Sequence, residues 1–118
     1  MSKMMKVKVQ DLTGVALDYA VDRAANSHKY SEQLSCIRVS NNSFNPSSSW
    51  NQCGVLITRY QISFSVLTGE VYASAELHEW PGSAYGESHL QAACRAIVVA
   101  RIGEEIDVPV EFLKRSGQ

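Results

Sequence analysis

Apolar and polar residues alternate in two runs between positions 61 and 78, and the pair Thr68-Gly69 separates the runs. Side chains of a β-strand point to opposite faces in turn, so this alternation gives each run one apolar face. A short glycine-containing pair between two such runs is typical of a β-hairpin. The pattern therefore predicts a hairpin over residues 61–78 with one buried face.

A wide apolar stripe at the three- and four-residue spacing of an α-helix runs through residues 88–102. Ser88 and Gln91 have the spacing of a capping box at its start, and Gly103 follows its last turn, where helices often end. We predict a helix over residues 88–102 that packs in the core. Its apolar stripe is wide enough that contact with a second copy, and hence a homo-oligomer, is left open.

Residues 12–25 also repeat apolar side chains at steps of three and four, which predicts a second helix. Asp11 is the expected N-cap, because its carboxylate can accept hydrogen bonds from the free amides of the first turn. Asp18 and Asp22 lie outside the apolar stripe, so we expect both carboxylates to stay in solvent. A short strand is expected at residues 7–9.

Two segments in the middle of the chain are less regular. Residues 34–40 alternate in part, which predicts a strand. Residues 50–60 fit a strand by the alternation of their β-branched residues, and they fit a helix if Ser48 or Ser49 is the N-cap. We favour the helix and keep the strand as the alternative.

Polar and chain-breaking residues mark two loops. Residues 41–49 are rich in Asn and Ser and contain a proline, so their side chains compete for the local backbone. Residues 80–86 combine a tryptophan, a proline and two glycines, which predicts a second loop. After Pro109 we expect a final short turn, with Phe112 and Leu113 folded back onto the core.

These elements together predict a fold of the α+β class. A small antiparallel sheet, with the hairpin at its centre, would pack between N-terminal and C-terminal helices as an α/β sandwich. The 118 residues, of which 45% are hydrophobic, suit a single domain over residues 1–118 with an ordered core at about 6–113. We expect no membrane-spanning segment and no secretory signal, because long apolar runs are absent from the sequence.

The charge balance argues against nucleic-acid binding, since 11 basic and 12 acidic residues leave a net charge of -1. Lys3, Lys6 and Lys8 form the only basic concentration, and we interpret it as a solvated edge. An acidic group near the other end is interpreted in the same way; it comprises Glu104, Glu105, Asp107 and Glu111.

The three cysteines, Cys36, Cys53 and Cys94, form no Cys-x-x-Cys pair and are too few for a disulfide framework. They indicate a reduced protein in the cytoplasm. Cys94 is expected to be a small core residue. Cys53 lies near a helix start, where a thiol can become reactive, but no histidine has the sequence context of a catalytic base. We therefore predict no catalytic residue.

Metal binding and nucleotide binding are two further kinds of chemistry that a chain of this composition could support. Glu76, His78 and His89 include residue types that bind zinc or iron, yet their spacing matches no metal-binding motif, so no metal site is predicted. Neither Gly-x-Gly-x-x-Gly nor a Walker sequence occurs. We predict no cofactor.

The best candidate for binding a ligand or partner is the end of the Asn/Ser-rich loop. Asn45, Ser47, Ser48 and Trp50 place polar groups and an aromatic ring at an expected helix start, and Trp80 could complete a pocket. Free amides at a helix start attract anions, and tryptophan is common at interfaces. The alternative is purely structural, with a capped helix and Trp50 buried in the core.

Several segments, taken together, resemble the NinX-like family of small phage and prophage proteins, named after the nin region of lambdoid phages. Residues 12–21 contain Ala-Leu-Asp-Tyr-Ala where the family typically has Ala-Leu-Asp-Trp-Ala. Similar stretches lie at residues 46–54, 86–95 and 103–109. Cys53 stands where the family usually has glycine, which argues against a catalytic thiol, and Ser49 replaces an aspartate.

The resemblance implies an α/β sandwich and a phage or prophage origin, and it implies no particular activity, cofactor or catalytic residue. Our leading hypothesis is a phage accessory protein without enzymatic activity that binds a host or phage protein in the host cytoplasm. The alternative is a small enzyme, or a nucleotide- or anion-binding module, that uses the Asn/Ser-rich loop and Trp50.

Overall fold

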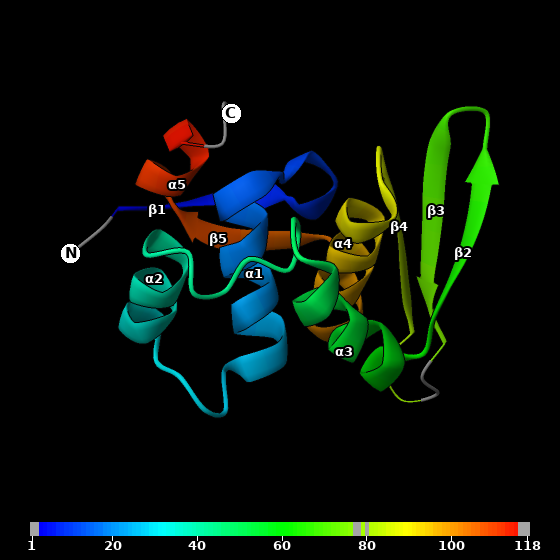
Figure 1. Ribbon diagram of the computed structural model, residues 1–118. Helices are drawn as coiled ribbons and strands as arrows, with labels where there is room; N and C mark the ends of the chain where they lie inside the picture. The colour runs from blue at the N-terminus through cyan, green and yellow to red at the C-terminus, as the bar shows by residue number, and fades with distance from the viewer. Residues whose placement is uncertain (1–2, 77–78, 80, 116–118) are drawn as a thin grey trace.

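The computed structural model describes residues 3–76, 79 and 81–115 (Figure 1). These residues form helices and two small antiparallel sheets, so the α+β class is confirmed. The helices are η1 (Val9–Asp11, a 3-10 turn), α1 (Gly14–Asn26), α2 (Glu32–Ser40), α3 (Trp50–Tyr60), α4 (His89–Arg101) and α5 (Val110–Arg115). The strands are β1 (Met4–Lys8), β2 (Ile62–Leu67), β3 (Glu70–Ala75), β4 (Gly82–Gly86) and β5 (Glu105–Pro109). None of the described helices is long and apolar enough to cross a membrane.

The smaller sheet joins the two ends of the described chain, because β1 pairs with β5 in antiparallel register. The register places Lys6 opposite Asp107 and Lys8 opposite Glu105, and the Lys6 and Asp107 side chains form an exposed ion pair at 3.8 Å. The basic and acidic groups at the two ends of the sequence therefore face each other. The strand at residues 105–109 was not predicted, whereas the predicted burial of Phe112 and Leu113 is confirmed.

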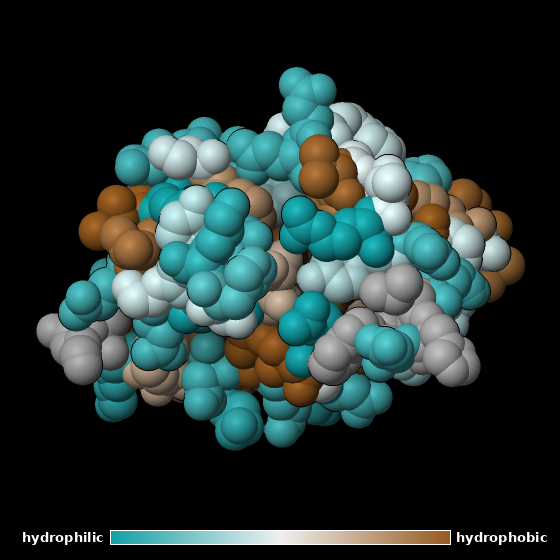
Figure 2. All heavy atoms as spheres, turned by 90° about the horizontal axis from the view of Figure 1, so that it is seen from below, coloured by the Kyte–Doolittle hydropathy of each residue, from teal (hydrophilic) through white to brown (hydrophobic). Residues whose placement is uncertain are grey.

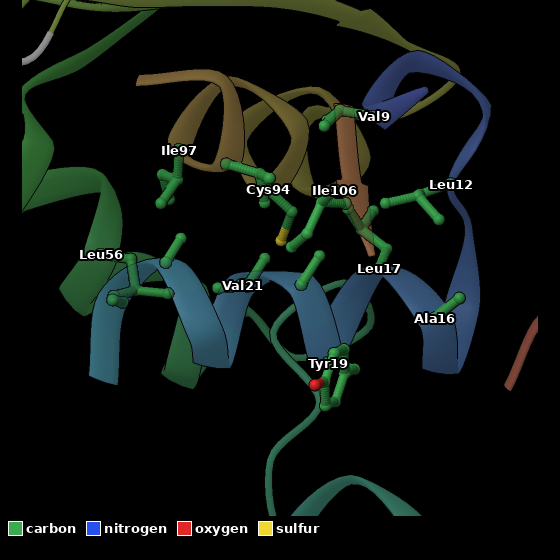
Figure 3. Close-up of a cluster of buried hydrophobic side chains, with 14 of the residues drawn as sticks. Val9, Leu12, Ala16, Leu17, Tyr19, Val21, Leu56, Cys94, Ile97 and Ile106 are labelled. Carbon is green, nitrogen blue, oxygen red and sulfur yellow. The ribbon is translucent and has the colours of Figure 1, made fainter. Parts of the chain in front are cut away.

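The main core lies between α1 and α4. Figure 3 shows Leu17 and Val21 of α1 on one side of this layer and Cys94 and Ile97 of α4 on the other. All four side chains are fully buried, and Cys94 is the small core residue that the sequence predicts. The helix predicted over residues 88–102 is confirmed, and Ser88 Oγ accepts a hydrogen bond from the Gln91 amide at 3.1 Å.

The start of α1 and its polar residues differ from the prediction. Asp11 belongs to η1, in which the Val9 amide donates a hydrogen bond to the Glu104 carbonyl. Helix α1 therefore begins later than predicted, and Thr13 is its N-cap. Asp18 and Asp22 are buried rather than exposed. The reason is tertiary, since α2 and the loop at 41–49 cover the side of α1 that faces away from α4 (Figure 1).

The strand predicted at residues 34–40 is wrong, because this segment lies in α2. Ser31 is the N-cap, and its hydroxyl accepts a hydrogen bond from the Leu34 amide at 3.2 Å. Ser35 and Val39, four residues apart, are the buried positions. The helix predicted at 50–60 is confirmed as α3, with Ser49 as the N-cap that receives the Gln52 amide.

The hairpin prediction is confirmed by β2 and β3, although only β3 is central in the three-stranded sheet. Thr68 and Gly69 have φ values of 45° and 87°, the backbone of a tight hairpin turn. The loop predicted at 80–86 is wrong in part, because residues 82–86 form β4 and pair with β3. The glycines of this strand permit its close contact with α4: a Cβ at Gly82 would lie 2.6 Å from the Ala100 nitrogen.

Candidate functional site

Internal hydrogen bonds hold the Asn/Ser-rich loop in shape. The Asn45 amide donates to Gln52 Oε1 at 2.7 Å, and the Ser48 amide donates to the Asn45 carbonyl at 3.0 Å. Phe44 and Pro46 are buried and anchor the loop to the core. The loop is therefore a fixed platform that leads into α3.

A buried carboxylate fastens the same loop to α1. The Ser47 amide donates to Asp18 Oδ1 at 2.8 Å. Burial raises the pKa of Asp18 from its ordinary value of 3.8 to about 6, although hydrogen bonds from Ser47 partly oppose this rise. Folding therefore favours the protonated form of Asp18 relative to the unfolded chain.

This shift predicts a pH-dependent stability that Asp18→Asn should remove. Between pH of about 4 and about 6 the folded chain binds more protons at Asp18 than the unfolded chain, so the free energy of unfolding should fall as pH rises and then level off. Urea unfolding of the wild-type and Asp18→Asn chains from pH 4 to pH 8 gives the difference between their free energies of unfolding. The contributions of the other carboxylates cancel in this difference. A difference that does not change with pH would contradict the assignment.

The loop offers little for an anion. The Ser47 amide is taken by Asp18 and the Gln52 amide by Ser49, so two donors near the start of α3 have partners within the chain. The Asp18 carboxylate beneath the loop is largely ionised at neutral pH and would repel an anion. The predicted anion-binding module therefore stays a prediction without support from these contacts.

Trp50 points away from the core. Its exposed fraction is 60%, so the interpretation that buries it is wrong. The Trp50 ring lies 6.3 Å from that of His89 at the start of α4, and the His89 ring meets the Phe64 ring of β2 edge-on at 5.0 Å. We call these three residues the aromatic row.

The aromatic row adjoins the apolar face of the hairpin, part of which is exposed to solvent. Val66 follows Phe64 on the same face of β2 and has an exposed fraction of 64%. Trp80, which we expected to complete a pocket, lies outside the described residues. The structure thus brings Trp50 together with Phe64 and His89, two residues that the sequence did not connect with Trp50 because no local pattern links them.

A second apolar surface lies beside α2. A groove of about 430 Å³ is lined by side chains from α1, α2, β1 and β5, namely Met4, Tyr19, Glu32, Gln33, Cys36, Ile37 and Pro109. Burial raises the pKa of the Cys36 thiol, which keeps it protonated and a poor nucleophile. Seen from below, hydrophobic side chains form separate small patches among hydrophilic ones, one of them on the side where α2 lies (Figure 2).

The other two cysteines lie inside the protein. Cys53 of α3 and Cys94 of α4 are fully buried, and their thiols share a hydrogen bond. This hydrogen bond and burial raise the pKa of Cys94, so it stays a thiol. Across the described parts of the chain, no three His, Cys, Asp or Glu side chains are placed to hold a metal ion.

Comparison with models of protein families shows to which family this chain belongs. The model of the Bacteriophage P22 NinX family matches residues 8–101. The chain belongs to the NinX family. A search of curated proteins finds no match.

The NinX match includes the Asn/Ser-rich loop and all three members of the aromatic row. The resemblance found at residues 12–21, 46–54 and 86–95 falls within the matched region. The segment at 103–109 lies beyond it, in β5 and the turn before it.

Proposed function

We propose that this NinX-family chain is a phage accessory protein that acts in the host cytoplasm by binding a host or phage protein through the aromatic row. The observation that carries the proposal is the exposure of Trp50, 60% of whose surface is free, at one end of that row. Tryptophan is enriched at protein interfaces relative to the rest of the surface and is frequent among the residues that dominate binding energy.

Charge favours a protein partner over a nucleic acid. The net charge is -1, and the only basic concentration, on β1, faces the acidic residues of β5. An aromatic ring can stack on a base, but nucleic-acid sites combine such rings with a basic groove. The neighbours of Phe64 on β2 are uncharged, so this strand adds no basic residue to the aromatic row.

The proposal predicts that Trp50→Ala strongly weakens partner binding without unfolding the chain. Tagged wild-type and variant chains would be captured from infected cells, and the recovered proteins compared by mass spectrometry. We expect a specific partner whose recovery drops by about tenfold or more in Trp50→Ala, as for other central aromatic residues of interfaces.

Val55→Ala is the matched control, because Val55 is on the same helix, has the same exposed fraction of 60% and lies outside the aromatic row. It should leave partner recovery unchanged. Equal recovery with wild-type, Trp50→Ala and Val55→Ala chains would refute a role for the row. A stabilising shift of the melting temperature with a nucleotide, lost in Trp50→Ala, would instead support the ligand-binding alternative.

A further inference from the structure

The two outer edges of the three-stranded sheet differ. On β4, the Tyr85 backbone is covered by the Gln10 side chain, whose Nε2 donates to the Tyr85 carbonyl at 2.7 Å while its Oε1 accepts from the Tyr85 amide at 3.2 Å. Arg95 Nη1 also donates to that carbonyl, at 2.8 Å. Gln10 thus takes the place of a neighbouring strand at Tyr85.

The edge formed by β2 is open. The Gln61 carbonyl accepts a hydrogen bond from the Glu76 amide. Along an antiparallel pair, every second residue of a strand forms backbone hydrogen bonds to its neighbour, so residues 63, 65 and 67 bond to β3. The amide and carbonyl groups of the residues between them point outward, namely those of Ile62, Phe64 and Val66. Within the described chain, no hydrogen bond reaches these outward groups. Figure 1 shows β2 on the outside of the hairpin, with every other labelled element on the β3 side.

The open edge also lacks the features that usually prevent pairing. Soluble proteins protect edge strands with charged residues, prolines or bulges. β2 reads Ile-Ser-Phe-Ser-Val-Leu and has none of these, and its pairing with β3 is regular through all six residues. Val66 and Leu67 are exposed by 64% and 54%.

We propose that a second copy of this chain pairs with β2 in antiparallel orientation, about a twofold axis at Phe64, to form a continuous six-stranded sheet. In this register Phe64 lies opposite its own copy and Val66 lies opposite Ile62 of the partner, so the outward amide and carbonyl groups of all three residues bond across the axis. The apolar residues share one face, and Ser63 meets Ser65 of the partner on the other. The strand is self-complementary because it carries no charge that would meet its like.

The size of the contact sets the expected strength. A six-residue strand is about 20 Å long. A strand pair of that length buries less than the roughly 800 Å² per partner of a standard stable interface. The dimer is therefore expected to dissociate on dilution, between about 1 mM and about 10 µM.

Sedimentation velocity over that concentration range tests the proposal. The average mass of the wild-type chain should rise from 13.0 kDa towards twice that value. Val66→Lys places a charge in two symmetry-related cross-strand pairs and should raise the dissociation constant about tenfold or more. Val55→Lys, the same change at an equally exposed position on α3, should dimerise as the wild type does, and melting curves check that both variants are folded.

A cross-linking experiment tests the register. In a Cys36→Ser background, Ser63→Cys and Ser65→Cys chains mixed under mild oxidation by oxidised glutathione should form a mixed disulfide, because directly opposed residues at such positions lie about 4.5 Å apart. Ser65→Cys alone should cross-link poorly, since its own copy is displaced by two residues. A mass that stays at one chain, equal dimerisation of Val66→Lys, or equal cross-linking of both samples would overturn the proposal. Trp50→Ala should still dimerise, so this result and that for partner binding are independent.

Discussion

Gly86→Ala should lower the free energy of unfolding by about 3 kcal/mol, in the upper range for overpacking a buried contact. A Cβ at Gly86 would lie 2.5 Å from the Ala92 nitrogen and 2.9 Å from its Cα. Both atoms belong to the backbone of α4, which is packed against α1 on its other side and has no room to retreat. Strand β4 would have to move away from α4, weakening the bonds that Gln10 and Arg95 make to Tyr85.

Urea unfolding measures this loss, and Gly54→Ala is its control. Gly54 lies inside α3, and a Cβ there would meet no atom within 4 Å. Because alanine is a better helix former than glycine, this change should instead stabilise the chain by about 0.5–1 kcal/mol. If the two variants shifted stability in the same direction, the close approach of β4 to α4 would be wrong.

Asp22→Ala should destabilise the chain by about 3 kcal/mol, as expected when one partner of a buried ion pair is removed. Asp22 is fully buried, and its Oδ1 accepts from Arg38 Nη1 at 2.6 Å and from Asn26 Nδ2 at 2.7 Å. The Arg38 guanidinium lies 4.0 Å from the ring centre of Tyr30 and 4.7 Å from that of Phe44. Without Asp22 this cation would remain between two rings with its main counter-charge gone.

Two variants separate this effect from a general loss of charge. Asp107→Ala breaks the exposed ion pair with Lys6 and should cost less than about 1 kcal/mol, because water screens that pair. Adding Arg38→Met to Asp22→Ala should recover part of the stability, since no unpaired cation is then left. Equal losses for Asp22→Ala and Asp107→Ala in thermal or urea unfolding would contradict the structural assignment.

Elements with strong local signals were predicted correctly. Ser88 caps α4 as predicted, and Ser49, one of the two candidates offered for residues 50–60, caps α3, because capping depends on a side chain and amides only three residues apart. The β2–β3 hairpin was also found, since alternation and the Thr68-Gly69 turn are both local. The family match at residues 8–101 includes three of the four segments that carry the resemblance.

The predictions were wrong where the same type of residue is common in two different structural settings. Glycines in 80–86 suggested a loop, whereas Gly82 and Gly86 allow a strand to lie against a helix far along the sequence. In α2 the alternation was accidental, because the apolar residues Leu34 and Ile37 face solvent. A short amphipathic helix and a short strand share too many positions for seven residues to distinguish them.

The candidate site was predicted only in part. The loop and Trp50 were singled out correctly as a unit that begins a helix, but the exposure of Trp50 was left open, and its contacts with His89 and Phe64 were not foreseen. These residues come from three elements, and only packing brings their rings together. The hydrogen bond from the Ser47 amide to Asp18 was not foreseen either, because Asp18 lies 29 positions earlier in the chain.

The amino-acid sequence by itself determined the α+β class, the cap of α4, the hairpin and the family, since each depends on residues within a few positions or on a pattern along the chain. Tertiary structure alone decided that Asp18 and Asp22 are buried, that β4 is a strand and that β2 has an open edge. Burial and edge pairing depend on which surfaces meet, and that is settled by contacts between distant segments.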